Sequence, residues 1–431
     1  MFEALKQREA NGSRIRVGLI GAGAMGIGIA WQIARTPGME LVFVADLKRE
    51  ALEQAVAASG GVMKEVTDFA NTSRGAGEIL VTDDATRLMT SENGLEFDVL
   101  VESSNTIGAA ARYCLDAIAR GAHVVLMNAE VDLALGPYLS SEAAKQGVVV
   151  TSDAGDQHGV LARMIDEIEM WGFQITQAGN MKGFLDRHQT AAGLIEEAAK
   201  RNLDPVQCCA YTDGTKLNVE MALLSNGRNL LPFVDGMEGP KAERVENVLD
   251  LFDFDSYGGV GRVDYVLGAE PGGGVYVVGK CDDATQIPYL KYYKLAGKGH
   301  YWLFYRPYHL CHLETTRAIA LAVLYGKSVL TPNYGRVADV YAYAKSDFEA
   351  GQVIRHGIGG DEFYGLIRLV EEAERDEGSL GVPMTLLESE GGAHPKLLRP
   401  VAKDQVISSD DIEIPDTYLY RLFQAQQSLL G

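Results

Sequence analysis

The sequence predicts an α/β protein that begins with a doubly wound parallel sheet. An apolar strand pattern leads into a glycine-rich turn, GAGAMG at 21–26, and then a helical pattern over 27–35. A second apolar run at 41–45 ends on Asp46. Strand and helix patterns then alternate to about residue 152, as expected for consecutive βαβ units. These three observations favour a Rossmann-type domain.

Apolar runs and helical periodicity place the elements of this domain in order. Strands are expected at 15–20, 41–45, 79–81, 98–102, 123–127 and 148–151, and helices at 27–35, 50–58, 108–120 and 138–146. The polar, glycine-rich residues 60–78 are expected to be loop with some helix. Ligands of such sheets bind outside the carboxyl ends of the strands, which points to the loops 102–105 and 128–130.

The glycine turn has the arrangement that holds a dinucleotide. Gly21 permits the tight turn, Gly23 lets the backbone approach a pyrophosphate, and Gly26 lets helix and strand pack closely. The free N–H groups at the helix start can bind phosphate. We therefore expect a nicotinamide cofactor, the alternative being a glycine-rich turn without a ligand. The expected cofactor-binding residues are Gly21, Gly23, Ala24, Met25, Gly26, Asp46, Ser103 and Asn128.

Asp46 bears on which nicotinamide cofactor binds. It lies 20 residues after Gly26, where a carboxylate accepts hydrogen bonds from the ribose 2′-OH and repels a 2′-phosphate. This favours NAD over NADP. Lys48 and Arg49 follow directly and suit a 2′-phosphate, unless they belong to a solvated turn, so NADP stays open.

Composition limits the classes of partner. The 431 residues are enough for two or three domains, and 39 Lys+Arg against 59 Asp+Glu give a net charge of −20. Such a chain repels nucleic acid and anionic membranes. There is no apolar stretch of about 18 residues and no apolar core of a signal peptide near the N-terminus. The five cysteines form no CxxC, which fits the reducing cytoplasm.

Two further domains are expected after the first, which we assign to residues 1–152. Residues 153–330 mix strands (174–178, 263–267, 275–280, 301–305) with helices (160–170, 191–201, 215–225, 313–324), which predicts an α+β catalytic domain. Residues 331–431 suggest a small β-rich module, because the segments 337–354 and 397–414 echo each other around an insertion at about 357–392. The amphipathic helix at 418–430 is expected to dock or to dimerise.

Three clusters in the central domain could carry acid–base chemistry. Lys182 lies between glycines after a predicted strand, and Lys216 and Glu220 share one helix face. Arg306 can grip an anion bidentately and His309 can titrate near neutrality. The plainer interpretations are a loop lysine, a surface ion pair and a domain-joining turn. Three converging cations, Lys182, Lys216 and Arg306, would form a positive pocket for an anionic substrate.

Other candidates are weaker. Asp156 and His158 lie in an interdomain loop and could contact substrate or cap the next helix. His309 and His312 have helical spacing, but no third zinc ligand of usual spacing accompanies them. A divalent metal on Glu220, Asp156 or Glu314 stays open.

Several segments together resemble the homoserine-dehydrogenase-related oxidoreductases. They are the glycine turn at 21–26, the NAEVD loop at 128–132, DGTK with VEMA at 213–222, and RPYHL with LE at 306–314. The likeness is greatest to the branch that contains a deoxyxylulose-phosphate reductoisomerase-like enzyme. That resemblance implies a pyridine-nucleotide domain, a central catalytic and oligomerisation domain, and a C-terminal SAF-like domain. By similarity, Lys182, Lys216, Glu220, Asn226, Arg306 and His309 would lie in the active cleft.

The chain also departs from this pattern. The branch enzyme uses NADPH on a phosphorylated deoxyketose, which Asp46 does not favour. The loop 156–158 and the stretch 179–188 differ as well, so the substrate is left open. Homoserine dehydrogenase activity is not expected, because Asn128-Ala129 replaces the family's Asn-Lys pair.

The sequence therefore predicts a cytoplasmic NAD(P)-dependent oxidoreductase, or an oxidoisomerase, acting on a small polyhydroxy or phosphorylated substrate. We expect it to form a homodimer or a larger homo-oligomer. The alternative is a dinucleotide-binding sensor or polysaccharide-assembly factor without turnover. Lys182 and Lys216 would polarise a carbonyl, Glu220 would orient Lys216, and Arg306 and His309 would hold an anionic group.

Overall fold

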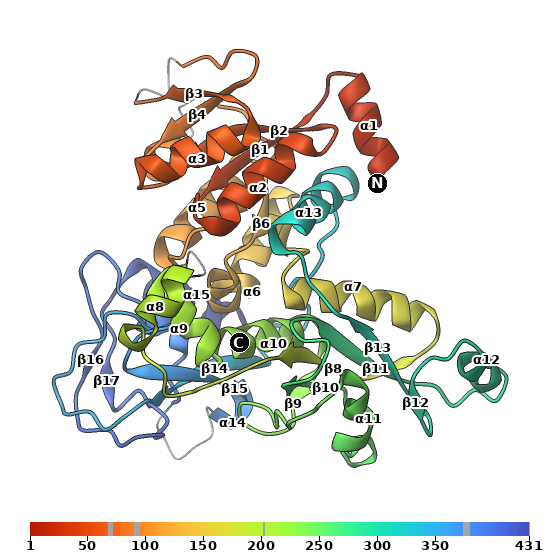
Figure 1. The fold of residues 1–431 in the computed structure, drawn as a ribbon. Helices are drawn as coiled ribbons and strands as arrows, with labels where there is room; N and C mark the ends of the chain where they lie inside the picture. Colours follow the sequence, from red (N-terminus) through yellow and green to blue (C-terminus); the bar gives the residue numbers. More distant parts are fainter. Residues whose placement is uncertain (68–71, 90–94, 201–202, 374–379, 431) are drawn as a thin grey trace.

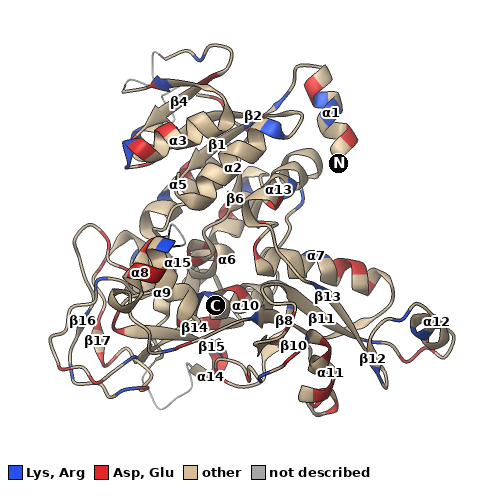
Figure 2. Cartoon of the chain, viewed as in Figure 1, with Lys and Arg blue, Asp and Glu red and all other residues tan. Residues whose placement is uncertain are grey.

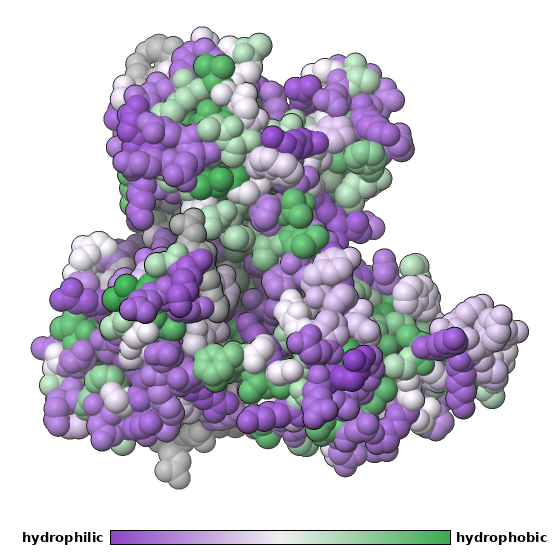
Figure 3. All heavy atoms as spheres, viewed as in Figure 1, coloured by the Kyte–Doolittle hydropathy of each residue, from purple (hydrophilic) through white to green (hydrophobic). Residues whose placement is uncertain are grey.

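The computed structural model describes residues 1–67, 72–89, 95–200, 203–373 and 380–430. Figure 1 shows an upper lobe that contains the first sheet and a wider lower part that contains the second sheet and the C-terminal region. The hydropathy surface in Figure 3 narrows between the two. The mixed α/β class, with a parallel Rossmann-type sheet and a small β-rich C-terminal region, is confirmed.

The first sheet has seven parallel strands in the order β3-β4-β2-β1-β5-β6-β7. The strands are β1 (Ile15–Ile20), β2 (Met39–Ala45), β3 (Val62–Glu65), β4 (Glu78–Thr82), β5 (Val99–Glu102), β6 (His123–Leu126) and β7 (Val150–Ser152). Helices α1 (Phe2–Ala10), α2 (Ala24–Arg35), α3 (Arg49–Ser59), α4 (Ala85–Leu88), α5 (Gly108–Ala119) and α6 (Ala129–Gln146) accompany them. The chain order reverses between β1 and β5, which opens a crevice at their carboxyl ends.

Two predictions for this lobe need correction. Residues 62–65, expected to be loop with some helix, form the edge strand β3, in which no residue is fully buried, so the segment carries little apolar signal. Helix α6 begins at Ala129 rather than near Tyr138. The Asn128 side chain caps it by accepting from the Val131 N–H at 3.2 Å, and Pro137 lies inside the helix instead of starting it.

The second sheet is mixed, with six strands in the order β12-β13-β11-β8-β10-β9. They are β8 (Gln174–Lys182), β9 (Leu231–Pro232), β10 (Arg262–Leu267), β11 (Val275–Lys280), β12 (Gly297–Lys298) and β13 (Tyr301–Arg306). Helix α7 (Gln157–Met170) packs on one face, against β8 and β11. On the other face, apolar side chains of residues 245–257 pack on β8, β10 and β11. Both faces of the sheet centre are therefore covered within one chain.

The remaining helices join the domains. In the central part these are α8 (Ile195–Lys200), α9 (Pro205–Thr212), α10 (Thr215–Arg228), α11 (Val248–Leu251) and α12 (Gln286–Tyr292). Helix α13 (Cys311–Tyr325) packs against α2 of the first lobe. Helix α10 lies between α6, α7 and the C-terminal strands β14 (Ala338–Ala344) and β15 (Phe363–Leu369). One hydrophobic core runs through the three regions.

The C-terminal region is built from short strand pairs: β14 with β15, and β16 (Lys396–Leu397) with β17 (Ile412–Glu413). The two echoing segments touch through single bridges, such as Tyr343 with Val406 and Phe348 with Val401. Because β15 pairs with β14 along its whole length, residues 357–392 are not an appended insertion. The short helices here are α14 (Val370–Ala373) and η5 (Met384–Leu387).

The last helix, α15 (Tyr418–Leu430), docks on α6 of its own chain. Gln426 is fully buried there, donating to the Ala134 carbonyl at 2.8 Å and accepting from the Tyr138 N–H at 3.0 Å. The buried face of α15 therefore packs against its own chain, so α15 is poorly suited to form a dimer contact.

Candidate functional site

The main cavity lies at the crevice between the first sheet and the helices α9 and α10, and its volume is about 570 Å³. One end is lined by the glycine turn and Asp46, and the other by Glu130, Asp156, Lys216 and Glu220. The expected cofactor residues Gly21, Gly23, Ala24, Met25, Asp46, Ser103 and Asn128 all line it. A cavity of this size that joins a strand-end crevice to charged side chains is the usual form of a ligand site.

The glycine turn has the geometry that a dinucleotide requires. Gly21 has a φ of +90°, and a Cβ on it would meet the Ser104 nitrogen at 2.5 Å. A Cβ on Gly26 would lie 2.0 Å from the Gly21 carbonyl oxygen, so close helix–strand packing excludes a side chain there. A Cβ on Gly23 would meet nothing within 4 Å and would project into open space. Gly23 precedes α2 without a side-chain cap, so the first N–H groups of α2 are available to a phosphate.

Asp46 is held rigidly at the end of β2. One carboxylate oxygen accepts from the Ala22 N–H at 2.7 Å, and the other accepts from the Lys48 N–H at 2.8 Å. Each oxygen keeps a further lone pair for a ligand hydroxyl. The glycine turn and the Asp46 carboxylate are therefore fixed to each other by these hydrogen bonds.

The loops after β5 and β6 complete the cofactor end. The Ser103 hydroxyl donates to the Gly21 carbonyl at 2.6 Å, and the Asn128 side chain donates to the Thr106 carbonyl at 2.7 Å. Glu102, at the end of β5, is fully buried, and its Oε2 has no hydrogen-bond partner in the described structure. Burial raises the pKa of Glu102 to about 8, so this acid is neutral at physiological pH.

Lys216 is the cation at the far end of the cavity. It lies in the first turn of α10, with a side chain only 16% exposed, and its Nζ is 2.9 Å from the Glu130 carboxylate. The same Nζ lies 5.0 Å from the centre of the Tyr211 ring. Burial disfavours its charge, but the neighbouring Glu130 carboxylate outweighs that effect and raises the pKa of Lys216. Lys216 is therefore a permanent ammonium.

Glu220 lies one turn further along α10 and faces the same cavity. The side-chain Nδ2 of the buried Asn180, in β8, donates a hydrogen bond to Glu220 Oε2 at 3.1 Å. The side-chain oxygen Oδ1 of Asn180 has no partner among the described residues. Asn180 was expected in a loop beside Lys182. The strand continues to Lys182 instead, and this places Asn180 inside the sheet, where it orients Glu220.

Two acidic residues, Asp153 and Asp156, lie in the loop between β7 and α7. Asp153 is fully buried, and its Oδ2 accepts from the N–H groups of Gly155 and Asp156 at 2.6 and 3.1 Å. Asp156 lines the cavity. Burial raises the pKa of Asp156 to about 8, and the charges of Asp153 and Glu220 add to the shift. Asp156 is thus poised to give or take a proton near neutral pH.

The structure separates the other predicted residues from this cavity. Lys182, Arg306 and His309 are not among the residues that line it. Arg306 donates through both terminal nitrogens to Glu314, at 3.1 and 2.7 Å, and His309 contacts the Gly273 carbonyl at 2.9 Å. Asn226 is used structurally, accepting from the Val337 and Ala338 N–H groups.

Of the three predicted cations, Lys182, Lys216 and Arg306, only Lys216 lines the main cavity. Six carboxyl groups and two ammonium groups belong to the lining residues: Asp46, Asp83, Glu130, Asp156, Asp204 and Glu220 against Lys48 and Lys216. Arg306, at the end of β13, instead pairs with Glu314 of the following helix α13, a contact that sequence spacing does not reveal. Glu130 and Tyr211, the close neighbours of Lys216, were absent from the predicted catalytic set. Only the strand-end position of the 128–130 loop pointed to Glu130.

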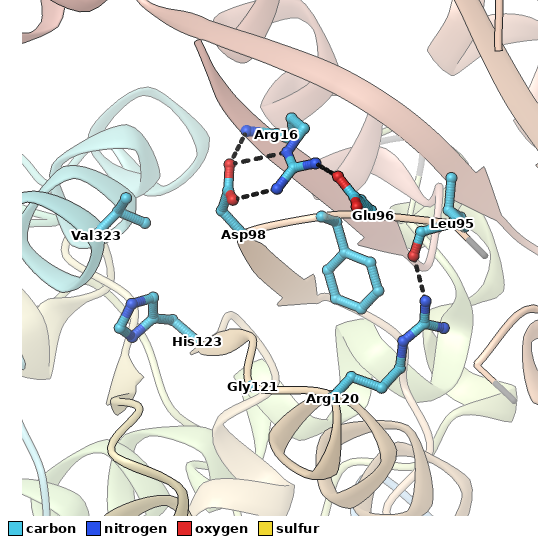
Figure 4. A pocket seen from close by; sticks show the side chains of 9 residues that line it. Arg16, Leu95, Glu96, Asp98, Arg120, Gly121, His123 and Val323 are labelled. Atoms are coloured by element: carbon cyan, nitrogen blue, oxygen red, sulfur yellow. Dashed lines mark hydrogen bonds and ion pairs between the residues drawn. The ribbon is translucent and has the colours of Figure 1, made fainter. Parts of the chain in front are cut away.

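A second hollow, of about 510 Å³, lies at the opposite, amino-terminal end of the first sheet (Figure 4). Arg16 faces Asp98, with an Nη2–Oδ1 distance of 2.8 Å, and also pairs with Glu96. Arg120 points at the Leu95 carbonyl. These charges pair with one another, and the carboxyl ends of the strands lie elsewhere, so this hollow is a weaker candidate for a ligand site than the main cavity.

Within the described ranges, the structure contains neither a cluster of metal ligands nor a helix suited to cross a membrane. No three or more His, Cys, Asp or Glu side chains converge so as to hold a metal ion. The candidate ligands Glu220, Asp156 and Glu314 thus do not make a metal centre, and no step below uses one. No described helix has the length and apolar character needed to cross a membrane.

The fold and cavity together define a dinucleotide-dependent class of protein, and comparisons with known families agree. Residues 21–152 match the family model of the homoserine dehydrogenase NAD binding domain. Residues 155–315 match the catalytic domain of oxidoreductase DRL. Together, the two matches describe an NAD(P)-dependent oxidoreductase. The glycine turn lies in the first matched domain and Lys216 lies in the second.

Solved structures show more distant likeness. GenD2 from gentamicin A biosynthesis, in complex with NAD, is 12% identical over 73% of this chain and 87% of its own, with a TM-score of 0.38. A probable dehydrogenase from Thermotoga maritima is 10% identical over 73% and 90%, with a TM-score of 0.42. No curated protein matches the sequence significantly. At these TM-scores, no property of those structures passes to this chain.

Proposed function

We propose that this protein interconverts a carbonyl and an alcohol on a small, neutral, polyhydroxylated substrate, with NAD as the preferred cofactor. The observation that carries the proposal is the arrangement of the main cavity. A dinucleotide cradle at one end runs directly into a buried ammonium surrounded by three carboxyls at the other.

The chain's residues have distinct roles in this reaction. The bound nicotinamide supplies the hydride acceptor or donor. Lys216 donates a hydrogen bond to the reacting oxygen and stabilises its negative charge, since its ammonium keeps its protons. Asp156 gives the proton to that oxygen in reduction and takes it in oxidation. Asn180 holds Glu220, which binds a neighbouring hydroxyl.

The charge of the cavity supports a neutral substrate. Carboxyl groups outnumber cations in its lining, and a phosphate placed beside Glu130 and Glu220 would be repelled. Hydroxyl groups suit the same walls, because each can donate to a carboxylate.

Turnover of a substrate panel tests the proposal. Purified protein is mixed with NAD and neutral polyols, with NAD and sugar acids, and with NADH or NADPH and phosphorylated ketoses, while NADH or NADPH absorbance is followed. We expect activity with neutral polyols, and a reductive rate that falls as pH rises through about 8, where Asp156 loses its proton. Turnover only with phosphorylated ketoses would favour the oxidoisomerase instead. NAD binding without turnover of any compound would contradict an enzymatic role.

A further inference from the structure

One segment of the second sheet extends away from the rest of the molecule. Between β11 and β13 the chain forms an arm, residues 284–300, that contains α12 and β12 and projects at the edge of the molecule (Figures 1 and 3). Helix α12 has no buried residue. The exposed fractions of Tyr289, Tyr292 and Tyr293 are 55%, 78% and 71%. Three neighbouring exposed tyrosines are typical of protein interfaces, because each ring offers a large apolar face with a polar tip.

The arm is also basic within an acidic protein. Residues 284–300 contain three lysines and no acidic residue, although the whole chain has a net charge of −20. Lys298 pairs with Asp250 at 2.8 Å. Lys291 and Lys294, further out, make no ion pair with any residue that the structure describes, and Figure 2 shows basic residues around α12. The outer arm therefore presents tyrosines and unpaired positive charge to solvent.

An acidic ledge lies beside the base of the arm. Residues 245–257 include Glu246, Asp250, Asp253 and Asp255 and no lysine or arginine. The ledge covers the outer face of the second sheet, with its apolar side chains inward and Asp250, Asp253 and Asp255 exposed. Asp250 and Asp255 already bind the base of the arm, through Lys298 and Tyr301. Asp253 has no side-chain partner within the described ranges.

We propose that the arm docks on the acidic ledge of a second copy of this chain, so that two arms and two ledges pair about a two-fold axis. In such an isologous contact each copy gives its arm and receives the other's. Charge complementarity favours a copy of this chain as occupant, because one molecule presents both the exposed lysines of the arm, Lys291 and Lys294, and the exposed Asp253 of the ledge. The sheet face itself is not free for this purpose, since the ledge covers it.

Sedimentation velocity of paired charge-reversal variants tests this arrangement. Wild type is expected to sediment at about twice 46.7 kDa at low salt. Lys291→Glu with Lys294→Glu should give a monomer, and so should Asp253→Lys alone. Mixing these two variants should restore a dimer, because the glutamates of one arm then meet the new lysine of the other ledge, while the second contact keeps its native charges. High salt should weaken both dimers.

Controls separate the arm from general surface effects. Tyr325→Ser with Tyr334→Ser alters two exposed tyrosines outside the arm, 49% and 54% exposed, and should leave the dimer intact. Tyr289→Ser with Tyr292→Ser should shift it to monomer with an unchanged Tm. A monomeric wild type, a dimer that survives the arm variants, or a mixture that stays monomeric would each overturn the proposal. Nucleotide affinity, measured in parallel, reports on the cofactor site independently.

Discussion

Lys216 combines burial and charge in a way that neither a surface lysine nor an apolar core residue does. Its ammonium is held 2.9 Å from Glu130 and lies near the Tyr211 ring, in a cavity with few other cations. Such an ion pair costs desolvation, so its geometry is maintained only by the fold around it. A fixed ammonium can stabilise an alkoxide without first reorganising solvent.

Replacing Lys216 should therefore harm catalysis and spare cofactor binding. We expect Lys216→Met to lower kcat/KM by at least about tenfold, which corresponds to roughly 1.4 kcal/mol of transition-state stabilisation. NAD affinity, measured by calorimetry, should be unchanged, because Lys216 lies at the far end of the cavity. Lys182→Met is the matched control, since Lys182 does not line the cavity. Equal losses in both variants would argue against this assignment.

Asp46 should decide between the two nicotinamide cofactors. Its carboxylate is fixed by the Ala22 and Lys48 N–H groups and cannot swing away from a 2′-phosphate. We expect NAD(H) to bind more tightly than NADP(H), and Asp46→Ala to shift the preference toward NADP(H), helped by Lys48 and Arg49. Calorimetric titration of both proteins with both cofactors measures the shift. Tighter binding of NADPH by wild type would refute the prediction.

At the scale of elements, the turn between β1 and α2 contains glycines with different tasks. Gly23 borders open space, whereas Gly26 touches the Gly21 carbonyl. We expect Gly23→Val to abolish NAD binding and keep the wild-type Tm, because the added side chain enters only the space meant for pyrophosphate. Gly26→Val should lower Tm by several degrees, because it forces α2 away from β1. Calorimetry and thermal unfolding of both variants check this contrast, and full NAD affinity in Gly23→Val would contradict it.

The sequence predicted the cofactor end of the cavity better than the catalytic end. The glycine turn, Asp46 and the strand-end loops all belong to one local pattern, because parallel strands bring their carboxyl ends together. Lys216 and Glu220 could also be predicted, since helical spacing puts them on one face. Helical spacing gives no such information about Lys182 and Arg306, because neither was expected within a helix. Whether a cation faces a cavity or a counter-ion such as Glu314 depends on contacts between elements distant in sequence.

Over the whole molecule, burial of acids should set the pH dependence of stability. Burial raises the pKa of several carboxyls, six of them strongly: Glu102 and Asp156 to about 8, Glu388 to about 7, and Asp132, Asp153 and Asp264 to about 6. In the unfolded chain these groups titrate near 4. Between these values the folded protein holds more protons, so its stability is greatest at low pH and is lost as pH rises through the folded pKa values.

His158 acts in the opposite direction at the acid end. Burial lowers its pKa to about 4, so below its unfolded value of about 6.5 the unfolded state takes up a proton that the folded state refuses. Because six carboxyls oppose one histidine, the carboxyls dominate, and we expect stability to decline from about pH 6 toward pH 9.

We therefore expect Tm to be at least about 3 °C lower at pH 9 than at pH 6, measured by calorimetry without cofactor. General repulsion in a chain of net charge −20 has the same sign, but salt screens it. The decline caused by burial should persist in 0.5 M NaCl, to about that extent. It should shrink in Asp156→Asn with Glu102→Gln, whose amides do not titrate. If Tm is flat between pH 6 and 9, if 0.5 M NaCl abolishes the decline, or if the variant with Asp156→Asn and Glu102→Gln declines as steeply as wild type, these carboxyls are not buried as neutral acids.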